Sequence, residues 1–287
     1  MSPRDIAQVA RRGRRLELGP LAARRMARAH ATLQRMVAER RRIYGVTTGY
    51  GPLASHPVTP EHAATLQRHL VYHLASGVGA PLAREHARAT MAARAASLAR
   101  GHSGIGQGTF ALLLDLLDRD VVPVIPEMGT VGASGDLTPL AHVALVMMGE
   151  GEAFHAGERL PAAEALRRAG LAPITFGHKE AIALVNGTSC MTGIAAVNAD
   201  RMRNAVALGL RLAVLHAEVL GGRAEAWDAR FAAVRPHPGQ AAAHETLGWL
   251  AAGSARLVPA LHPPPVLDES AAVDGLLPEG ELPQDPY

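Results

Sequence analysis

The amino-acid sequence predicts a mainly α-helical protein. Alanine-rich segments with few β-branched residues recur along the chain, and Gly, Pro, Ser, Thr or Asp residues bound each of them. Hydrophobic residues make up 48% of the 287 residues, which is enough to bury a large core. This composition excludes disordered and collagen-like proteins.

The first predicted helix, residues 21–42, is amphipathic. Its apolar side chains follow near-helical spacing: Leu21, Met26, Leu33, Met36 and Val37. Further alanine-rich segments predict helices over residues 60–75, 82–100, 107–119, 135–149, 190–220 and 238–257. In the longest of these, apolar residues from Ile194 to Leu215 drift along one side, as in a long central helix of a bundle.

Two segments predict irregular structure. Residues 121–126, Val-Val-Pro-Val-Ile-Pro, have the composition of a strand, but their prolines cannot donate ladder hydrogen bonds. We therefore expect an extended connector there. Residues 259–287 are rich in Pro, Gly and acidic residues and predict a loop or linker.

Charge and cysteine content limit the partners and the compartment. Residues 1–42 hold twelve arginines, but no aromatic residue interleaves them, so a solvated helical face is favoured over a nucleic-acid interface. No apolar run approaches the roughly 20 residues that a membrane span needs. The single cysteine, Cys190, cannot form an internal disulfide, and no leader pattern opens the sequence. We expect a cytoplasmic protein without nucleic-acid or membrane partners.

Several common sites are not supported by the sequence. Residues 104–108 have the wrong glycine spacing for a dinucleotide fingerprint. His69 and His73 share a helical face, but no third zinc ligand follows at a recognisable spacing. Residues 132–136 almost match a serine-hydrolase nucleophile elbow, yet Asp136 stands where glycine is needed. We expect neither a metal nor a nucleotide cofactor.

Residues 129–142 are unusually rich in conformationally permissive residues. Gly132 and Gly135 allow a tight turn, and Ser134 or Asp136 could cap a helix that begins near Leu137. A plain capping turn is one interpretation. The sequence Gly-Thr-Val-Gly-Ala-Ser-Gly-Asp-Leu-Thr-Pro-Leu-Ala-His also resembles the signature of the aromatic amino acid ammonia-lyase family, which includes histidine, phenylalanine and tyrosine ammonia-lyases and related aminomutases.

This resemblance implies a prosthetic group made from backbone. In the family, the tripeptide matching Ala133, Ser134 and Gly135 cyclises and loses water to give 4-methylidene-imidazol-5-one, an electrophile. The residue types suit that chemistry: Gly135 has no side chain to hinder its amide nitrogen, and Ser134 supplies the hydroxyl that is eliminated. The implied fold is the fumarase/aspartase-like helical bundle of the family, preceded by a domain that bears this group.

Three further segments resemble family motifs in the same order, so the matches extend over residues 44–287. Residues 44–53 resemble the motif whose first tyrosine, here Tyr44, is the catalytic base. Residues 183–189 resemble the segment with an active-site asparagine, here Asn186, and residues 284–287 resemble the start of a motif that contains Tyr287. The resemblance also implies that Gly51 and Leu137 contact the substrate.

His73 and Leu74 occupy the positions that resemble the family's selectivity pair. A histidine followed by leucine is typical of tyrosine-selective members, in which the imidazole binds the phenol hydroxyl. Phenylalanine would leave a buried imidazole unpaired. Residues 220–240 also resemble bacterial tyrosine ammonia-lyases. The expected reaction is deamination of L-tyrosine to trans-4-coumarate, with histidine or phenylalanine as alternative substrates.

Length sets this sequence apart from the family. Family chains are nearly twice as long, so the sequence resembles an amino-terminal half, with a first domain over residues 1–188 and an incomplete helical bundle over residues 189–287. A fragment, one chain of a split enzyme and a short non-catalytic paralogue that acts in binding or assembly are all compatible with this. The complete protein is expected to be a homotetramer.

Overall fold

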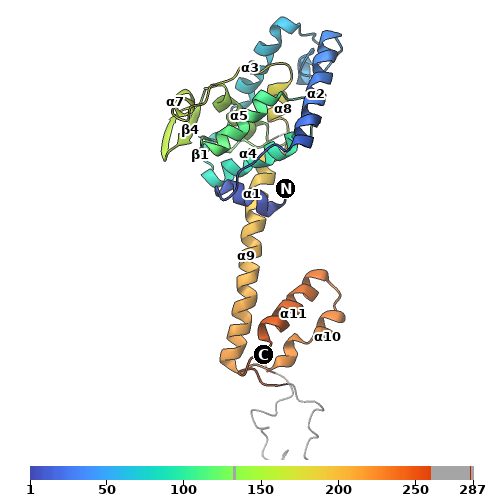
Figure 1. The fold of residues 1–287 in the computed structure, drawn as a ribbon, viewed down its shortest axis with the longest axis vertical. Helices are drawn as coiled ribbons and strands as arrows, with labels where there is room; N and C mark the ends of the chain where they lie inside the picture. The colour runs from blue at the N-terminus through green and yellow to red at the C-terminus, as the bar shows by residue number, and fades with distance from the viewer. Residues whose placement is uncertain (132–133, 260–284, 286–287) are drawn as a thin grey trace, which may run out of the picture. The chain divides into compact units, whose positions relative to one another are not determined.

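The computed structural model describes residues 1–131, 134–259 and 285. The chain divides into two compact units, Met1–Asp200 and Arg201–Tyr287 (Figure 1). The prediction of a mainly α protein is confirmed. The domain boundary between residues 188 and 189 stays a prediction.

The first unit is built from helices around a main apolar core, with a smaller apolar cluster of Leu33, Val37 and Val46. The helices are α1 (Pro3–Ala10), α2 (Pro20–Ala38), α3 (Ala63–Leu74), α4 (Arg84–Leu98), α5 (Gln107–Asp118), α6 (Leu137–Met147), α7 (Ala162–Arg168), α8 (Glu180–Val185) and the start of α9 (Ser189–Leu220). Two short 3₁₀ helices, η1 (Gly51–Leu53) and η2 (Pro60–His62), precede α3. Fully buried side chains from α4, α5, α6 and α8 form the centre: Met91, Leu113, Leu116, Leu140, Met147 and Leu184.

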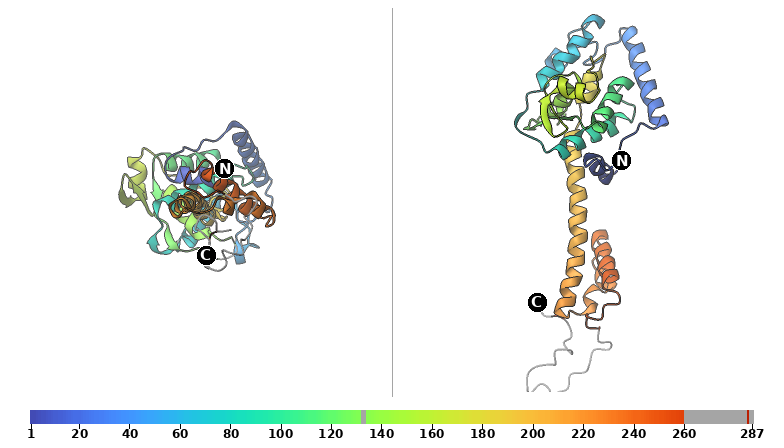
Figure 2. Two further views of the ribbon diagram at one scale, coloured as in Figure 1. Left: turned by 90° about the horizontal axis from the view of Figure 1, so that it is seen from below. Right: turned by 60° about the vertical axis from the view of Figure 1, so that its left-hand side comes forward.

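Helix α2 lies on the outside of this unit next to α5, on the side opposite α7 (Figures 1 and 2). Met26, Leu33 and Val37 face the interior as the spacing predicts, but Leu21 and Met36 are exposed. The helix also ends at Ala38 rather than at residue 42. The stripe of α2 that is buried is therefore narrower than the sequence pattern predicts.

Two small antiparallel sheets join the helices. Strand β1 (Val78–Pro81) pairs with β3 (Pro126–Met128), and β2 (Val122–Pro123), β4 (Glu152–His155) and β5 (Glu158–Pro161) form the second sheet in that order. The prediction that residues 121–126 form only a connector was wrong. Proline removes only its own donor, and Val124 N still donates to Glu152 O at 2.9 Å.

A buried ion pair fixes α1 against α4. The Arg88 guanidinium donates to Asp120 Oδ1 at 3.0 Å and to the carbonyls of Val9 and Ala10, both at 3.0 Å. Arg12 and Arg84 also pair with Asp120. Helix α1 was not predicted from the sequence, because Pro3–Ala10 is too short to show a clear helical period.

The second unit contains the later turns of α9, then η3 (Ala224–Trp227), α10 (Ala229–Ala233) and α11 (Pro238–Ala251). Large apolar side chains on α9 are exposed: Met202, Val206, Leu208, Leu212, Leu215, Val219 and Leu220. Residues 180–220 are long and apolar enough to cross a membrane. However, 61% of their most apolar 18-residue stretch is buried inside the protein, and the core helix of a soluble protein has the same properties.

Candidate active site

The predicted tripeptide lies just before α6, with two of its three residues in the described part of the chain. Ser134 is half-buried, and Gly135 has a φ of +79°, in the left-handed region that favours glycine. A Cβ on Gly135 would lie 3.3 Å from Thr188 Cγ2. Gly132 and Ala133 lie outside the described residues. The described turn therefore sits tightly against the segment that follows Asn186.

Asp136 joins the turn to the start of α9. Its buried carboxylate accepts hydrogen bonds from Thr130 Oγ1 at 3.1 Å and from Met191 N at 2.9 Å, and its own N donates to Gly187 O at 3.1 Å. Of the two predicted caps, Ser134 and Asp136, Asp136 occupies the N-cap position of α6, but its side chain makes no cap bond to α6 and binds the first turn of α9 instead. A carboxylate at a helix amino-terminus is also favoured by the helix dipole.

Asn186 follows α8 in extended backbone, and its side chain is exposed. Beneath it lies Arg94 of α4, only 6% exposed, whose Nη2 donates to Asn186 O at 2.9 Å and also to Ala183 O. Burial lowers the pKa of Arg94 to about 10. Within the described residues no carboxylate pairs with this guanidinium. Arg94 therefore holds the backbone of the asparagine segment at the expense of burying a charge.

Position 187 must be glycine because the Arg94 guanidinium lies directly against the main chain there. A Cβ there would fall on Arg94 Nη1. Gly187 therefore allows the main chain to pass directly over the guanidinium, next to the carbonyl that accepts from Asp136 N.

Tyr44 lies in a loop between α2 and η1. Its side chain is 54% exposed, and its phenolic oxygen accepts a hydrogen bond from Gly51 N at 2.9 Å. Gly45 has a φ of +67°, and a Cβ there would lie 2.6 Å from Ile182 Cδ1. Backbone geometry thus brings the predicted catalytic tyrosine and Gly51 together, next to α8.

Gln67 connects this loop to α8. It is fully buried on α3; its Nε2 donates to Gly45 O at 2.9 Å, and its Oε1 accepts from Ile182 N at 3.1 Å. Sequence reasoning missed both Gln67 and Arg94. The only signal for either is a polar residue on the apolar face of a helix, which does not identify its partner.

His73 and Leu74 form the carboxyl end of α3, which packs against α6 and α8. The His73 side chain is exposed, and Leu74 is partly buried against the core. Leu137, at the start of α6, is likewise partly buried. The elements that carry the tripeptide, Asn186 and the selectivity pair therefore pack on one another, although no direct bond joins His73 to the others in the described residues.

His142 on α6 also reaches this region. Its Nε2 is buried without a hydrogen-bond partner in the described residues, and a Cβ on Gly77 would lie 3.0 Å from it. Burial lowers the pKa of His142, so the neutral imidazole is favoured. The sequence motif contains this residue but gives it no role.

Tyr287 lies outside the described residues, while the neighbouring Asp285 accepts a hydrogen bond from Arg223 N at 2.8 Å. Among the residues that the structure describes, no group of three His, Cys, Asp or Glu side chains could hold a metal ion.

The described site therefore combines, in a mainly helical fold, a Ser-Gly turn bonded to the asparagine segment with a tyrosine loop next to α8. The family model described as aromatic amino acid lyase matches residues 1–287. The chain belongs to the aromatic amino acid lyase family.

Comparisons with individual proteins give the same family. This chain is 49% identical to tyrosine ammonia-lyase of Cereibacter sphaeroides over 251 residues, which are 87% of this chain and 48% of the relative. It is 44% identical to histidine ammonia-lyase of Symbiobacterium thermophilum over 87% of this chain and 49% of the relative. Phenylalanine aminomutase of Pantoea agglomerans matches in structure with a TM-score of 0.87 and 32% identity, over 100% of this chain and 55% of that one. The chain spans about half the length of these proteins.

Proposed function

We propose that the protein containing this chain eliminates ammonia from L-tyrosine to give trans-4-coumarate. The observation that carries the proposal is the bonding of the Ser134–Asp136 turn to the Asn186–Met191 segment, in a chain 49% identical to a tyrosine ammonia-lyase. The His73–Leu74 pair supports tyrosine over the other aromatic amino acids. Histidine is the second candidate, because histidine ammonia-lyases are 44% and 45% identical to this chain.

Aromatic amino acid lyases are known for the 4-methylidene-imidazol-5-one group, which we propose forms here from Ala133, Ser134 and Gly135; Ser134 and Gly135, the two described residues of this tripeptide, suit its formation. Gly135 lacks the side chain that would crowd Thr188, and hydrogen bonds at Asp136 hold the backbone directly after it. When formed, the group supplies an electrophile that activates the substrate amine for departure. Asn186 lies next to the same turn, where its exposed amide can orient polar groups.

Tyr44 is the proposed base that removes the β-proton of the substrate. Gly51 N donates to the phenolic oxygen, so this amide fixes the ring and supports negative charge on that oxygen. Gln67 fixes the start of the same loop through Gly45 O. The proton moves from the substrate β-carbon to Tyr44 Oη. The other proposed site residues of this chain position the substrate and the Tyr44 side chain for this transfer.

His73 is the proposed partner of the substrate hydroxyl, and Leu74 packs beside the substrate ring. In the complete site, the His73 imidazole would be shielded from water and hydrogen-bonded to the hydroxyl of tyrosine. Phenylalanine has no hydroxyl, so its binding would leave the imidazole without a partner. Gly51 and Leu137 complete the proposed contacts to the substrate.

We further propose a cytoplasmic homotetramer for the complete protein. The exposed apolar side chains of α9 support association, since an apolar helix face of this length is normally covered by other helices. Sedimentation analysis of the complete protein tests the assembly, and a monomer at micromolar concentration would contradict it.

Activity is tested with the complete protein and three substrates in parallel. We expect coumarate from tyrosine at a higher kcat/KM than urocanate from histidine or cinnamate from phenylalanine. Intact-mass analysis reports the prosthetic group separately, because cyclisation removes two water molecules. A cyclised tripeptide without coumarate formation would reject the tyrosine reaction, and an uncyclised tripeptide would favour a role in binding or assembly.

A further inference from the structure

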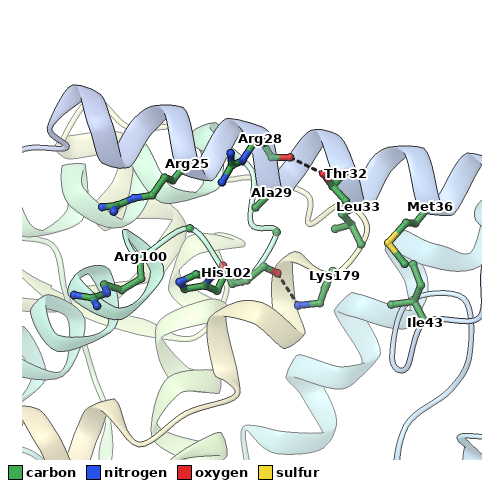
Figure 3. Close-up of a pocket in the computed structure, with 13 residues that line it drawn as sticks. Arg25, Arg28, Ala29, Thr32, Leu33, Met36, Ile43, Arg100, His102 and Lys179 are labelled. Carbon is green, nitrogen blue, oxygen red and sulfur yellow. Dashed lines mark hydrogen bonds between the residues drawn. The ribbon is translucent and has the colours of Figure 1, made fainter.

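A cavity lies in the first unit, between α2 and residues 100–104, which connect α4 to α5. Its volume is about 460 Å³, within the range of small-molecule sites. Lys179, just before α8, completes the lining (Figure 3). None of the residues assigned to the tyrosine reaction lines this cavity.

The connecting loop is held closely against α2, so the cavity has a defined shape. Gly101 and Gly104 have φ values of +79° and +76°, and a Cβ on Gly101 would lie 2.8 Å from Arg25 Cβ. A Cβ on Gly104 would lie 3.1 Å from Leu33 Cδ2. The carbonyl of Gly104 also lies 2.9 Å from Nδ1 of His30 on α2. Side chains at either glycine would push the loop away from the helix.

The lining is strongly cationic. Arg25 and Arg28 extend from α2, and Arg100 and His102 from the loop below it (Figure 3). The lining contains no acidic residue, and the three arginines form no ion pair within the described residues.

Lys179 adds a further charge to the lining. Its ammonium group donates to Ser103 O at 2.6 Å, and burial lowers its pKa. An ammonium group has three donors, so this one bond leaves others for an anion.

The opposite end of the cavity is apolar. Met36 and Ile43 lie away from Arg25 and Arg100, with Leu33 on the same side (Figure 3). A ligand that uses both ends needs a charged group and an apolar body. A single carboxylate is satisfied by one arginine, whereas three arginines match several phosphoryl oxygens, which guanidinium groups bind in a bidentate manner.

We propose that this cavity binds a nucleotide, with its phosphates at Arg25, Arg28 and Arg100 and its base against Leu33, Met36 and Ile43. This ligand is separate from the chemistry at Tyr44 and Ser134. The proposal does not depend on which amino acid the protein deaminates.

Calorimetric titration with ADP, pyrophosphate and adenosine tests the proposal at physiological ionic strength. We expect ADP to bind at least about tenfold more tightly than either of the other two, since each occupies only one end of the cavity. The double variant Arg25→Ala/Arg100→Ala should weaken ADP by about tenfold or more. Arg24→Ala is the matched control, because Arg24 is an exposed arginine on α2 outside the lining, and it should change affinity less than about twofold.

A second variant tests the apolar end. Met36→Ser should weaken ADP and leave pyrophosphate unchanged. Circular dichroism checks the fold of each variant, and Arg28→Ala provides an independent loss of affinity if the double variant is unfolded. The proposal is overturned if ADP fails to bind at millimolar concentration, if Arg24→Ala weakens it as much as the double variant, or if pyrophosphate binds as tightly as ADP.

Discussion

Replacing Arg94 by Met tests whether the buried guanidinium positions the asparagine segment. The substitution keeps much of the side-chain volume but removes the donors to Ala183 O and Asn186 O. We expect a large loss of activity in the complete enzyme with a small loss of stability. Two opposing free-energy contributions lead to this expectation.

Hydrogen bonds from a charged donor contribute about 1.5–3 kcal/mol each, so the two carbonyl bonds contribute about 3–6 kcal/mol. Against this, burial lowers the pKa of Arg94 from 12.5 to about 10, which corresponds to a cost of about 3 kcal/mol for keeping the charge. The net contribution to the free energy of unfolding is therefore about 0–3 kcal/mol. Removing the positioning of Asn186 should nevertheless lower kcat by about tenfold to a hundredfold.

Three measurements compare the Arg94→Met variant with the unsubstituted enzyme: the free energy of unfolding in urea, kcat and KM for tyrosine, and the cyclised fraction from intact mass. Arg88→Lys is the matched control, because Arg88 is also buried on α4 but bonds Asp120 and the end of α1. It should reduce stability without lowering kcat per folded protein. The reasoning is refuted if Arg94→Met unfolds the protein as readily as a broken buried ion pair does, by about 3–5 kcal/mol, or if kcat is unchanged.

Three further predictions concern the site. Ser134→Ala should change the free energy of unfolding by less than about 0.5 kcal/mol. It should abolish the loss of two water molecules seen by intact mass and also the activity, and retained coumarate formation would contradict this prediction. His73→Phe should shift the ratio of kcat/KM from tyrosine toward phenylalanine by about tenfold or more, as measured with both substrates. The lowered pKa of His142 means that the unfolded chain takes up a proton first, so stability falls as pH drops below about 6.5. His142→Gln should flatten that loss in urea unfolding at pH 7.5 and 5.5, and an unchanged loss would contradict the role of His142.

Helical segments with a sustained apolar pattern could be predicted from the sequence. Residues 107–119 and 135–149 correspond to α5 and α6 within two residues at each end, because alanine and leucine favour helix and permissive residues mark the ends. Short elements such as α8 and β2 could not, since a few residues do not establish a period. Pairing of β2 with β4 depends on a strand about thirty residues away.

The candidate site was predicted only in part. Its motif residues are local sequence signals, whereas Gln67 and Arg94 act on main-chain atoms far along the chain. Gln67 bonds Gly45 O and Ile182 N, and Arg94 bonds Asn186 O. A side chain that binds a carbonyl or an amide can pair with any residue type, so no pattern in the partner sequence reveals the contact.

These anchors have a common physical logic. Gln67, Arg94 and Asp136 all hold main-chain atoms of the segments on either side of the proposed site. A prosthetic group formed from backbone can close its ring only if backbone atoms are already held close together. Bonds to side chains would leave that backbone free to move, whereas buried bonds to carbonyls and amides restrict it directly. We therefore expect substitutions at these anchors to lower the cyclised fraction more than equally destabilising substitutions in the apolar core, such as Leu113→Ala. Equal loss of cyclisation at equal loss of stability would show that the anchors serve folding alone.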